Sequence, residues 1–200
     1  MRFRPPGLEI PAALRWLLLR ALGPIEPTAP SPGDAAALPE LLRGSSLGPL
    51  VGGRHSLETL ASEVGPRAAA RLKLENEAAR QAAGALLDML PEIRAAARTS
   101  GSSVVLLKFA ALTLGGHAPR GTRTAGDVDV LVDPETGHAV ARTLGEAGFR
   151  SAGFRDGAHQ LPQLRHEDGR RLELHLHVPG LRVPGAPAAA TAAALQAAGA

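Results

Sequence analysis

The sequence contains no cysteine and no tyrosine, and only four phenylalanines and one tryptophan among its 200 residues. Without cysteine the chain can form no disulfide, no thiolate zinc site and no cysteine nucleophile. Aromatic side chains are the surfaces on which nucleic-acid bases stack, so their scarcity argues against nucleic-acid binding. The charges agree, because 22 basic and 19 acidic residues give a net charge of only +3 and form no basic stripe. We therefore expect no nucleic acid among the partners.

Long hydrophobic runs are also lacking. The most apolar stretch, Ala12 to Leu22, is interrupted by Arg15 and Arg20, and it is shorter than the roughly 20 apolar residues that cross a membrane. The first residues, Met1 to Pro6, show neither the apolar segment nor the cleavage site of a signal peptide. We expect no membrane association and a cytoplasmic location.

The pattern of the chain changes at Gly101. Before it, apolar residues recur at helical spacing, and after it short β-branched runs alternate with helical segments. This pattern predicts an α+β fold, with a small mixed sheet flanked by helices and preceded by an all-helical region. The predicted bounds are 1–100 for the helical region, 101–178 for the core and 179–200 for an Ala/Pro/Gly-rich tail, expected as a frayed end or one weak helix.

Several residues predict where the helices of the first 100 residues begin and end. Asp34 and Ser56 are candidate N-caps. Pro66 opens the longest helix, because proline is tolerated in a first turn. Pro91 is expected to kink or interrupt that helix, since it removes an internal hydrogen bond and clashes with the preceding turn.

Lysine is rare in this sequence and occurs only at Lys73 and Lys108. Lys108 lies within an apolar run, Val104 to Phe109. Because burying an ammonium group is costly unless it is paired, Lys108 is expected to have an anionic partner.

The segment Asp127 to Val132 is predicted to be a strand because it is short and rich in valine. Side chains alternate across a strand, so Asp127 and Asp129 should share one face and the valines the other. Two neighbouring carboxylates repel each other unless a cation, a proton or solvent compensates. Mg²⁺ binds through one or two carboxylates plus phosphate oxygens, which fits this pair. The alternative is an edge strand whose aspartates only face water.

A second strand, Arg171 to Val178, alternates in the same way. Glu173, His175 and His177 share the polar face of this strand. If the apolar faces of both strands are buried together, Glu173 lies beside the two aspartates, and three carboxylates line one polar groove. The histidines could instead bind zinc by themselves, although nearby carboxylates favour magnesium or manganese.

A series of spaced signatures resembles the uncharacterised nucleotidyltransferase family of the DNA polymerase β-like superfamily. The signatures are Leu107-Lys108, Arg123-Thr-Ala-Gly126-Asp127-Val-Asp129-Val-Leu-Val, Ala147-Gly148-Phe149, His159 with Pro162, and Leu172-Glu173-Leu174-His175. They extend over about 80 residues, which makes them far more specific than an Asp-x-Asp pair alone.

The resemblance implies a role for each matching residue. Asp127, Asp129 and Glu173 would bind Mg²⁺ or Mn²⁺, and Glu173 would also activate the attacking hydroxyl. Lys108 and Arg123 would hold the phosphates of the nucleotide. His159 and His175 match recurrent family histidines of unassigned role, and we predict that they contribute with Gly126 to nucleotide binding. The implied reaction is attack by an acceptor hydroxyl on the α-phosphate of a nucleoside triphosphate (NTP), with release of pyrophosphate. The acceptor would be a small molecule or a protein.

Two departures from the family pattern define an alternative. Family members usually read Leu-Lys-Gly, whereas here Phe109 follows Lys108. A phenylalanine would bring a Cβ and a large ring to where backbone amides approach phosphates. Relatives also continue further beyond the Glu173 strand, which implies that a protein partner completes the acceptor site or that the site is missing. The alternative is an inactive nucleotidyltransferase-like protein that serves binding or assembly in a biosynthetic or toxin-type system.

Overall fold

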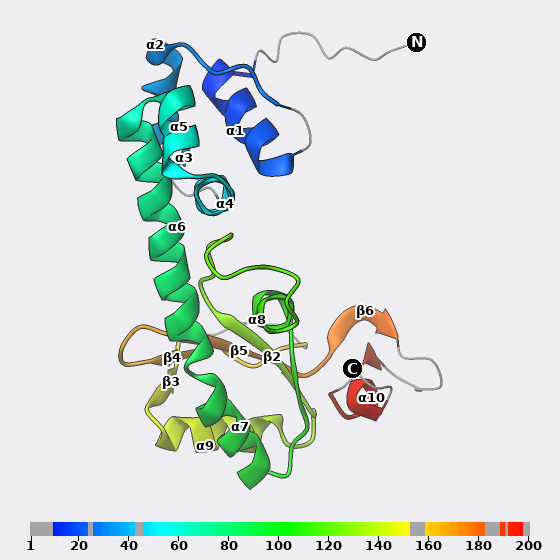
Figure 1. Ribbon diagram of the computed structural model, residues 1–200. Helices are drawn as coiled ribbons and strands as arrows, with labels where there is room; N and C mark the ends of the chain where they lie inside the picture. The colour runs from blue at the N-terminus through cyan, green and yellow to red at the C-terminus, as the bar shows by residue number, and fades with distance from the viewer. Residues whose placement is uncertain are drawn as a thin grey trace. The chain divides into compact units, whose positions relative to one another are not determined.

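The computed structural model describes residues 10–23, 26–42, 46–152, 159–182, 189–190 and 192–197. Its contacts divide the chain into two units. The helical unit comprises the residues up to Gln81 together with Arg120–Thr124, and the sheet unit comprises Ala82–Pro119 and the residues from Ala125 onward. The combination of an N-terminal set of helices with a mixed sheet confirms the predicted α+β class (Figure 1). The predicted domain bounds at residues 100 and 178 stay predictions.

The helical unit consists of short helices and the first part of a long one. They are α1 (Ala12–Leu22), α2 (Pro32–Ala35), α3 (Leu38–Leu42), α4 (Leu47–Arg54), α5 (Leu57–Val64) and α6 (Pro66–Leu87). Ser56 caps α5, because its hydroxyl accepts a hydrogen bond from the backbone N–H of Thr59, as predicted. The prediction for Asp34 is wrong: Ser31 caps α2, and Asp34 donates its backbone N–H to that hydroxyl.

The core of the helical unit is built around large side chains from different helices. Trp16 and Leu17 of α1 are buried with Leu38, Leu60 and Leu72 from later helices. Burying each of these side chains contributes about 1.5–3 kcal/mol relative to exposure.

Gly52 allows α4 to approach α6 closely. A Cβ added at Gly52 would overlap the backbone carbonyl oxygen of Leu72, which cannot move without distorting α6. Gly52→Ala should therefore destabilise the protein by about 1–3 kcal/mol. Gly84→Ala is the matched control, because nothing lies within 4 Å of a Cβ there and α6 is helical at that position. This control should gain roughly 0.5–1 kcal/mol. Urea unfolding followed by circular dichroism measures both, and equal stabilities for the two variants would contradict the packing argument.

Proline interrupts the long helical segment where predicted. Helix α6 ends at Leu87, a turn occupies Asp88 and Met89, and α7 (Leu90–Thr99) follows with Pro91 in its first turn. Proline has no N–H to continue the hydrogen-bond ladder of α6, but it fits the first turn of a new helix.

One mixed sheet forms the centre of the sheet unit. Its strands are β1 (Val104–Leu106), β2 (Val128–Val132), β3 (Phe149–Ser151), β4 (Leu164–His166) and β5 (Arg171–His175). The order across the described strands is β1-β2-β5-β4-β3. Strand β2 pairs antiparallel with β1 and parallel with β5, and β4 pairs antiparallel with both of its neighbours. Helices α8 (Lys108–Leu114) and α9 (Gly137–Glu146) connect the strands.

One face of the sheet carries the hydrophobic core. Val128, Val130, Leu172 and Leu174 on β2 and β5 are buried in one cluster with residues from the end of α6, from α7 and from α9. Figure 1 shows α7 and α9 lying together beneath the sheet. The polar residues that alternate with these core residues must therefore project from the opposite face.

The strands near the C-terminus differ from the prediction. The expected strand 171–178 ends at His175. Strand β4 covers only 164–166, and an isolated bridge joins Gln160 to His175. In the predicted tail the structure has β6 (Val178–Arg182), β7 (Ala189–Ala190) and α10 (Ala192–Ala197). The backbone N–H of Ala193 donates a hydrogen bond to the Asp133 carboxylate.

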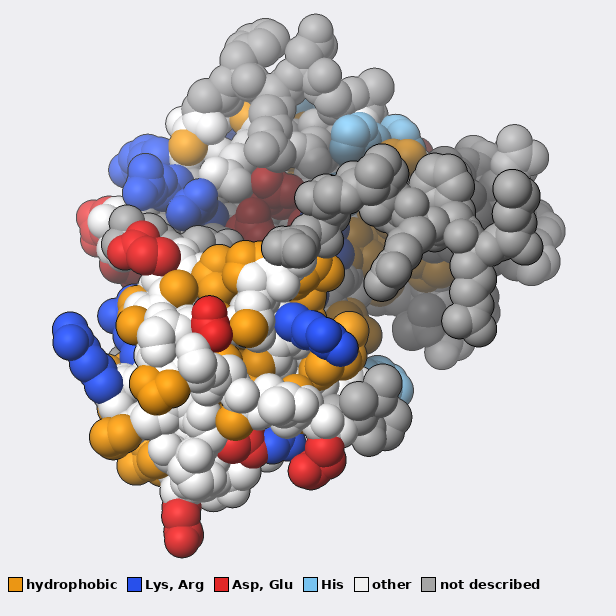
Figure 2. All heavy atoms as spheres, turned by 90° about the horizontal axis from the view of Figure 1, so that it is seen from above, with side chains coloured by type: hydrophobic (Ala, Val, Ile, Leu, Met, Phe, Trp, Pro, Cys, Tyr) orange, Lys and Arg blue, Asp and Glu red, His pale blue; other side chains and the backbone are white. Residues whose placement is uncertain are grey.

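Charged side chains of both signs are interspersed on the face shown in Figure 2, and hydrophobic side chains lie exposed between them. A surface of this kind has no extended field of one sign. Among the described residues, no helix combines the length and apolarity that a membrane crossing requires.

Candidate active site

Strands β2 and β5 place two carboxylates side by side. In the parallel pairing Asp129 lies directly opposite Glu173, so both side chains project from the same face of the sheet. Strand β2 lies between β1 and β5, and all five of its residues are buried. The alternative of a solvent-facing edge strand is therefore wrong. Asp129 and Glu173 are only 3% and 6% exposed, which is rare for carboxylates unless they have partners.

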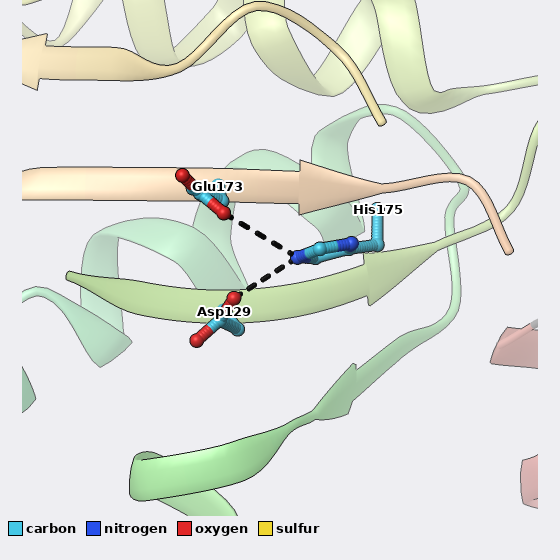
Figure 3. Close-up of side chains that lie close together, drawn as sticks. All are labelled: Asp129, Glu173 and His175. Atoms are coloured by element: carbon cyan, nitrogen blue, oxygen red, sulfur yellow. Dashed lines mark hydrogen bonds and ion pairs between the residues drawn. The ribbon is translucent and has the colours of Figure 1, made fainter. Parts of the chain in front are cut away.

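His175 joins the two carboxylates from two positions further along β5 (Figure 3). Its Nε2 lies 3.0 Å from Oδ1 of Asp129 and 3.8 Å from Oε2 of Glu173. Because a carboxylate only accepts, Nε2 donates in the hydrogen bond to Asp129. One ligand atom from each of these three residues lies within 4.8 Å of the others.

Lys108 adds a cation to the same site. Its Nζ lies 2.5 Å from Oδ1 of Asp129, the oxygen that also accepts from His175. The Lys108 side chain is 59% exposed, whereas that of Asp129 is 4% exposed, so the ammonium group reaches the buried carboxylate from the solvent side. This contact supplies the anionic partner expected for Lys108.

The backbone of Lys108 adopts a left-handed conformation, with φ at 45°. Among the described residues other than glycine, no other has a positive φ. For a residue with a Cβ this conformation costs roughly 1–2 kcal/mol, and such strain is concentrated at functional sites.

Two substitutions at Lys108 separate this strain from the loss of the amine. Lys108→Gly and Lys108→Ala both remove the ion pair, but only glycine adopts a positive φ without a steric penalty. The glycine variant should be the more stable by about 1 kcal/mol. Chemical unfolding of the two variants measures the difference, and an alanine variant of equal or greater stability would show that the backbone at Lys108 is unstrained.

The electrostatics distinguish the two aspartates. Burial, and then the charges of Asp129 and Glu173, raise the pKa of Asp127 above its ordinary value. Burial also acts to raise the pKa of Asp129, but the hydrogen bonds from His175 and Lys108 outweigh it and the pKa is lowered. The hydrogen bond to Asp129 in turn raises the pKa of Lys108. The site therefore holds concentrated negative charge that its own cationic and N–H groups offset in part.

Phe109 lies in the hydrophobic core. Its side chain is 4% exposed and belongs to the cluster that contains Val128 and Val130. The large ring that distinguishes this chain from the Leu-Lys-Gly pattern is therefore packed away from the carboxylates.

The remaining predicted residues have different surroundings. Arg123 is exposed and belongs to the segment Arg120–Thr124 of the helical unit, where Asn76 donates a 2.7 Å hydrogen bond to the carbonyl of Gly121. Gly126 is exposed and directly precedes Asp127. The predicted roles of Arg123 and Gly126 stay predictions.

His159 lies close to two other histidines. Its ring stacks on that of His175 with centroids 6.2 Å apart and meets the ring of His177 edge-on at 6.1 Å. The backbone carbonyl of His159 accepts hydrogen bonds from the N–H groups of Leu176 and His177. His159 thus lies beside the carboxylate site, but it is not one of the three residues whose ligand atoms converge there. Its predicted role in nucleotide binding stays a prediction.

The sequence reasoning missed Gln163. Its Nε2 donates a 3.0 Å hydrogen bond to Oε1 of Glu173 from the neighbouring strand segment. Glu173 accepts this hydrogen bond from Gln163, whereas Asp129 accepts from Lys108 and His175, so each carboxylate is held in a defined orientation. The one available signal was the amide residue itself, directly before the residues that form β4, and residue type alone does not identify its partner.

The donor set fits a divalent cation. Two buried carboxylates and one imidazole converge on one region, and uncompensated carboxylates at this proximity would repel each other. Carboxylate oxygens suit Mg²⁺ and Mn²⁺, and imidazole suits transition metals.

Comparison with known proteins agrees with this geometry. The family model described as uncharacterised nucleotidyltransferase matches residues 31–195, which include all of the residues named in this site. No curated protein and no solved structure is significantly similar to the chain. The match spans well over half of the sequence, and the chain belongs to the uncharacterised nucleotidyltransferase family.

Proposed function

We propose that this protein transfers a nucleoside monophosphate from an NTP to a hydroxyl group of an acceptor, in a reaction that depends on a divalent cation. The observation that carries the proposal is that Asp129 and Glu173 lie directly opposite each other on adjacent parallel strands. The Lys108 ammonium group donates a hydrogen bond to Oδ1 of Asp129 at the same site. Family membership supports the nucleotidyl-transfer part of the proposal.

In this proposal Asp127, Asp129 and Glu173 hold Mg²⁺ or Mn²⁺. The cation supplies charge neutralisation for the phosphates, which is the main requirement of phosphoryl-type transfer. The acceptor oxygen forms a bond to the α-phosphorus while the bond from that phosphorus to the pyrophosphate oxygen breaks. Glu173 is the group that accepts the proton of the acceptor hydroxyl, and pyrophosphate leaves with the electron pair.

The cationic and neutral residues have supporting roles in the same proposal. Lys108 exchanges its contact with Asp129 for a phosphate oxygen of the nucleotide, and Arg123 provides a second cation for the phosphates. Gly126 allows close approach of the backbone, and His159 contacts the nucleotide. The acceptor is a small molecule or a protein.

A specific observation also favours the alternative of an inactive binding or assembly protein. The Lys108 ammonium group neutralises the carboxylate oxygen that a cation would need, and a permanent ion pair of this kind would leave a folded but inactive site. The two functions differ in whether a cation with nucleotide displaces Lys108.

Calorimetric titration with ATP, GTP, CTP and UTP, each with and without Mg²⁺, tests the proposal. We expect at least one nucleotide to bind, and its binding to require Mg²⁺, because the triphosphate would otherwise meet uncompensated carboxylates. Absence of Mg²⁺-dependent binding for all four nucleotides would support the inactive alternative.

A further inference from the structure

The cation site contains a nitrogen donor. His175 is 6% exposed, and its Nε2 is directed at Oδ1 of Asp129, 3.0 Å away, and toward Oε2 of Glu173 at 3.8 Å (Figure 3). Within the described residues these are the three side chains of metal-ligating type whose ligand atoms converge.

The spacing of these atoms suits a shared cation. Ligand atoms bonded at about 2.1 Å to one cation lie roughly 3 Å apart when neighbouring bonds are perpendicular. The separation of 3.0 Å between His175 and Asp129 already matches this value. The separation of 3.8 Å to Glu173 is longer, and rotation about the bonds of the glutamate side chain can shorten it.

The hydrogen-bond donors around Asp129 also favour a cation at this position. Two N–H donors, from Lys108 and from His175, converge on one oxygen of Asp129 and supply positive charge where a cation would supply it. A bound cation would replace the N–H hydrogen of Nε2. Nε2 can bind a cation in the tautomer that carries the ring hydrogen on Nδ1, and exchange with water interconverts the two tautomers.

We propose that Nε2 of His175 ligates the catalytic cation together with Asp129 and Glu173, and that the site consequently prefers Mn²⁺ over Mg²⁺. This inference rests on the proposed function, since it concerns the cation of the same reaction. A ligand set that includes an imidazole beside the carboxylates favours Mn²⁺, because Mg²⁺ strongly prefers oxygen ligands whereas transition metals accept nitrogen.

Electron spin-echo envelope modulation of the full chain loaded with Mn²⁺ tests the proposal. Protein with natural ¹⁴N should show the modulation of a directly bound imidazole nitrogen, and protein labelled with ¹⁵N-histidine should lose the ¹⁴N pattern. Because this experiment uses the unmodified chain, it does not depend on the folding of any variant. Calorimetry should find Mn²⁺ bound at least about tenfold more tightly than Mg²⁺.

Two variants assign the nitrogen. His175→Gln keeps a donor for Asp129 but has no imidazole, and it should weaken Mn²⁺ binding about 10- to 100-fold while Mg²⁺ binding changes by less than about threefold. His159→Gln is the matched control, because its ring is adjacent to His175 but outside the converging group, and it should leave the modulation unchanged.

The outcomes separate this inference from the proposed function. Mn²⁺ that binds without imidazole modulation would overturn the role of His175 and leave the proposed function intact. A modulation that persists in His175→Gln would likewise overturn it. A chain that binds neither Mn²⁺ nor Mg²⁺, with or without nucleotide, would overturn both.

Discussion

Asp129→Asn is expected to reduce Mg²⁺-dependent nucleotide affinity at least about 100-fold while the protein remains folded. The substitution removes a carboxylate that lies opposite Glu173 on the adjacent strand. This carboxylate accepts hydrogen bonds from Lys108 and His175. Loss of residues that only support a metal ligand already costs 10- to 100-fold, so loss of the ligand itself should cost at least as much.

The folded state should tolerate this change. Asparagine has nearly the same shape and keeps a carbonyl oxygen that accepts from His175. The Lys108 side chain is 59% exposed, so its charge can return to water, and the free energy of unfolding should change by no more than about 1 kcal/mol.

Asp133→Asn is the matched control just beyond the end of the same strand. The Asp133 carboxylate accepts from the backbone N–H groups of Ser103 and Ala193, so its loss should destabilise the protein by about 1.5–3 kcal/mol without affecting the cation. Calorimetry should show a loss of nucleotide affinity for Asp129→Asn only, and urea unfolding should show a loss of stability for Asp133→Asn only. If Asp129→Asn unfolds the protein, or leaves nucleotide binding unchanged, Asp129 is structural.

Lys108→Met is expected to change cation binding and nucleotide binding in opposite directions. Without the ammonium group, Asp129 no longer has to release a partner before it binds a cation, so Mn²⁺ affinity should rise about two- to fivefold. The same variant lacks a charged donor for the phosphates, and its affinity for nucleotide with metal should fall roughly 10- to 100-fold. Calorimetric titrations with Mn²⁺ alone and with nucleotide plus Mn²⁺ measure the two effects.

Lys108→Arg is the control for this prediction, because it retains the charge while changing its shape. It should keep the cation affinity of the unchanged protein and lose less nucleotide affinity than the methionine variant. A methionine variant that binds nucleotide as tightly as the unchanged protein would mean that Lys108 serves only to neutralise Asp129.

The sequence predicts the convergence of the carboxylates because strand alternation is a strong constraint. Once Val128 and Val130 on one strand and Leu172 and Leu174 on the other are placed in the core, Asp129 and Glu173 must share the opposite face. The break before Pro91 is also predictable, because the proline ring has no N–H to donate and clashes with the preceding turn of a helix.

Other features depend on tertiary contacts that no local pattern encodes. The partner of Gln163 follows from the placement of one strand segment beside another. The positive φ of Lys108 occurs in a residue type that normally avoids it, so propensity predicts the opposite. The N-cap of α2 is Ser31 and not Asp34. Serine and aspartate are about equally good N-caps, so residue type alone does not decide between them.

Anomalous X-ray diffraction from crystals of the protein grown with Mn²⁺ and a non-hydrolysable NTP analogue tests the central claim most directly. We predict a metal peak bonded to both Asp129 and Glu173, with the Lys108 ammonium group moved from Asp129 to a phosphate oxygen. Crystals that contain the analogue but retain the Lys108–Asp129 ion pair, with no metal between the two carboxylates, would contradict it.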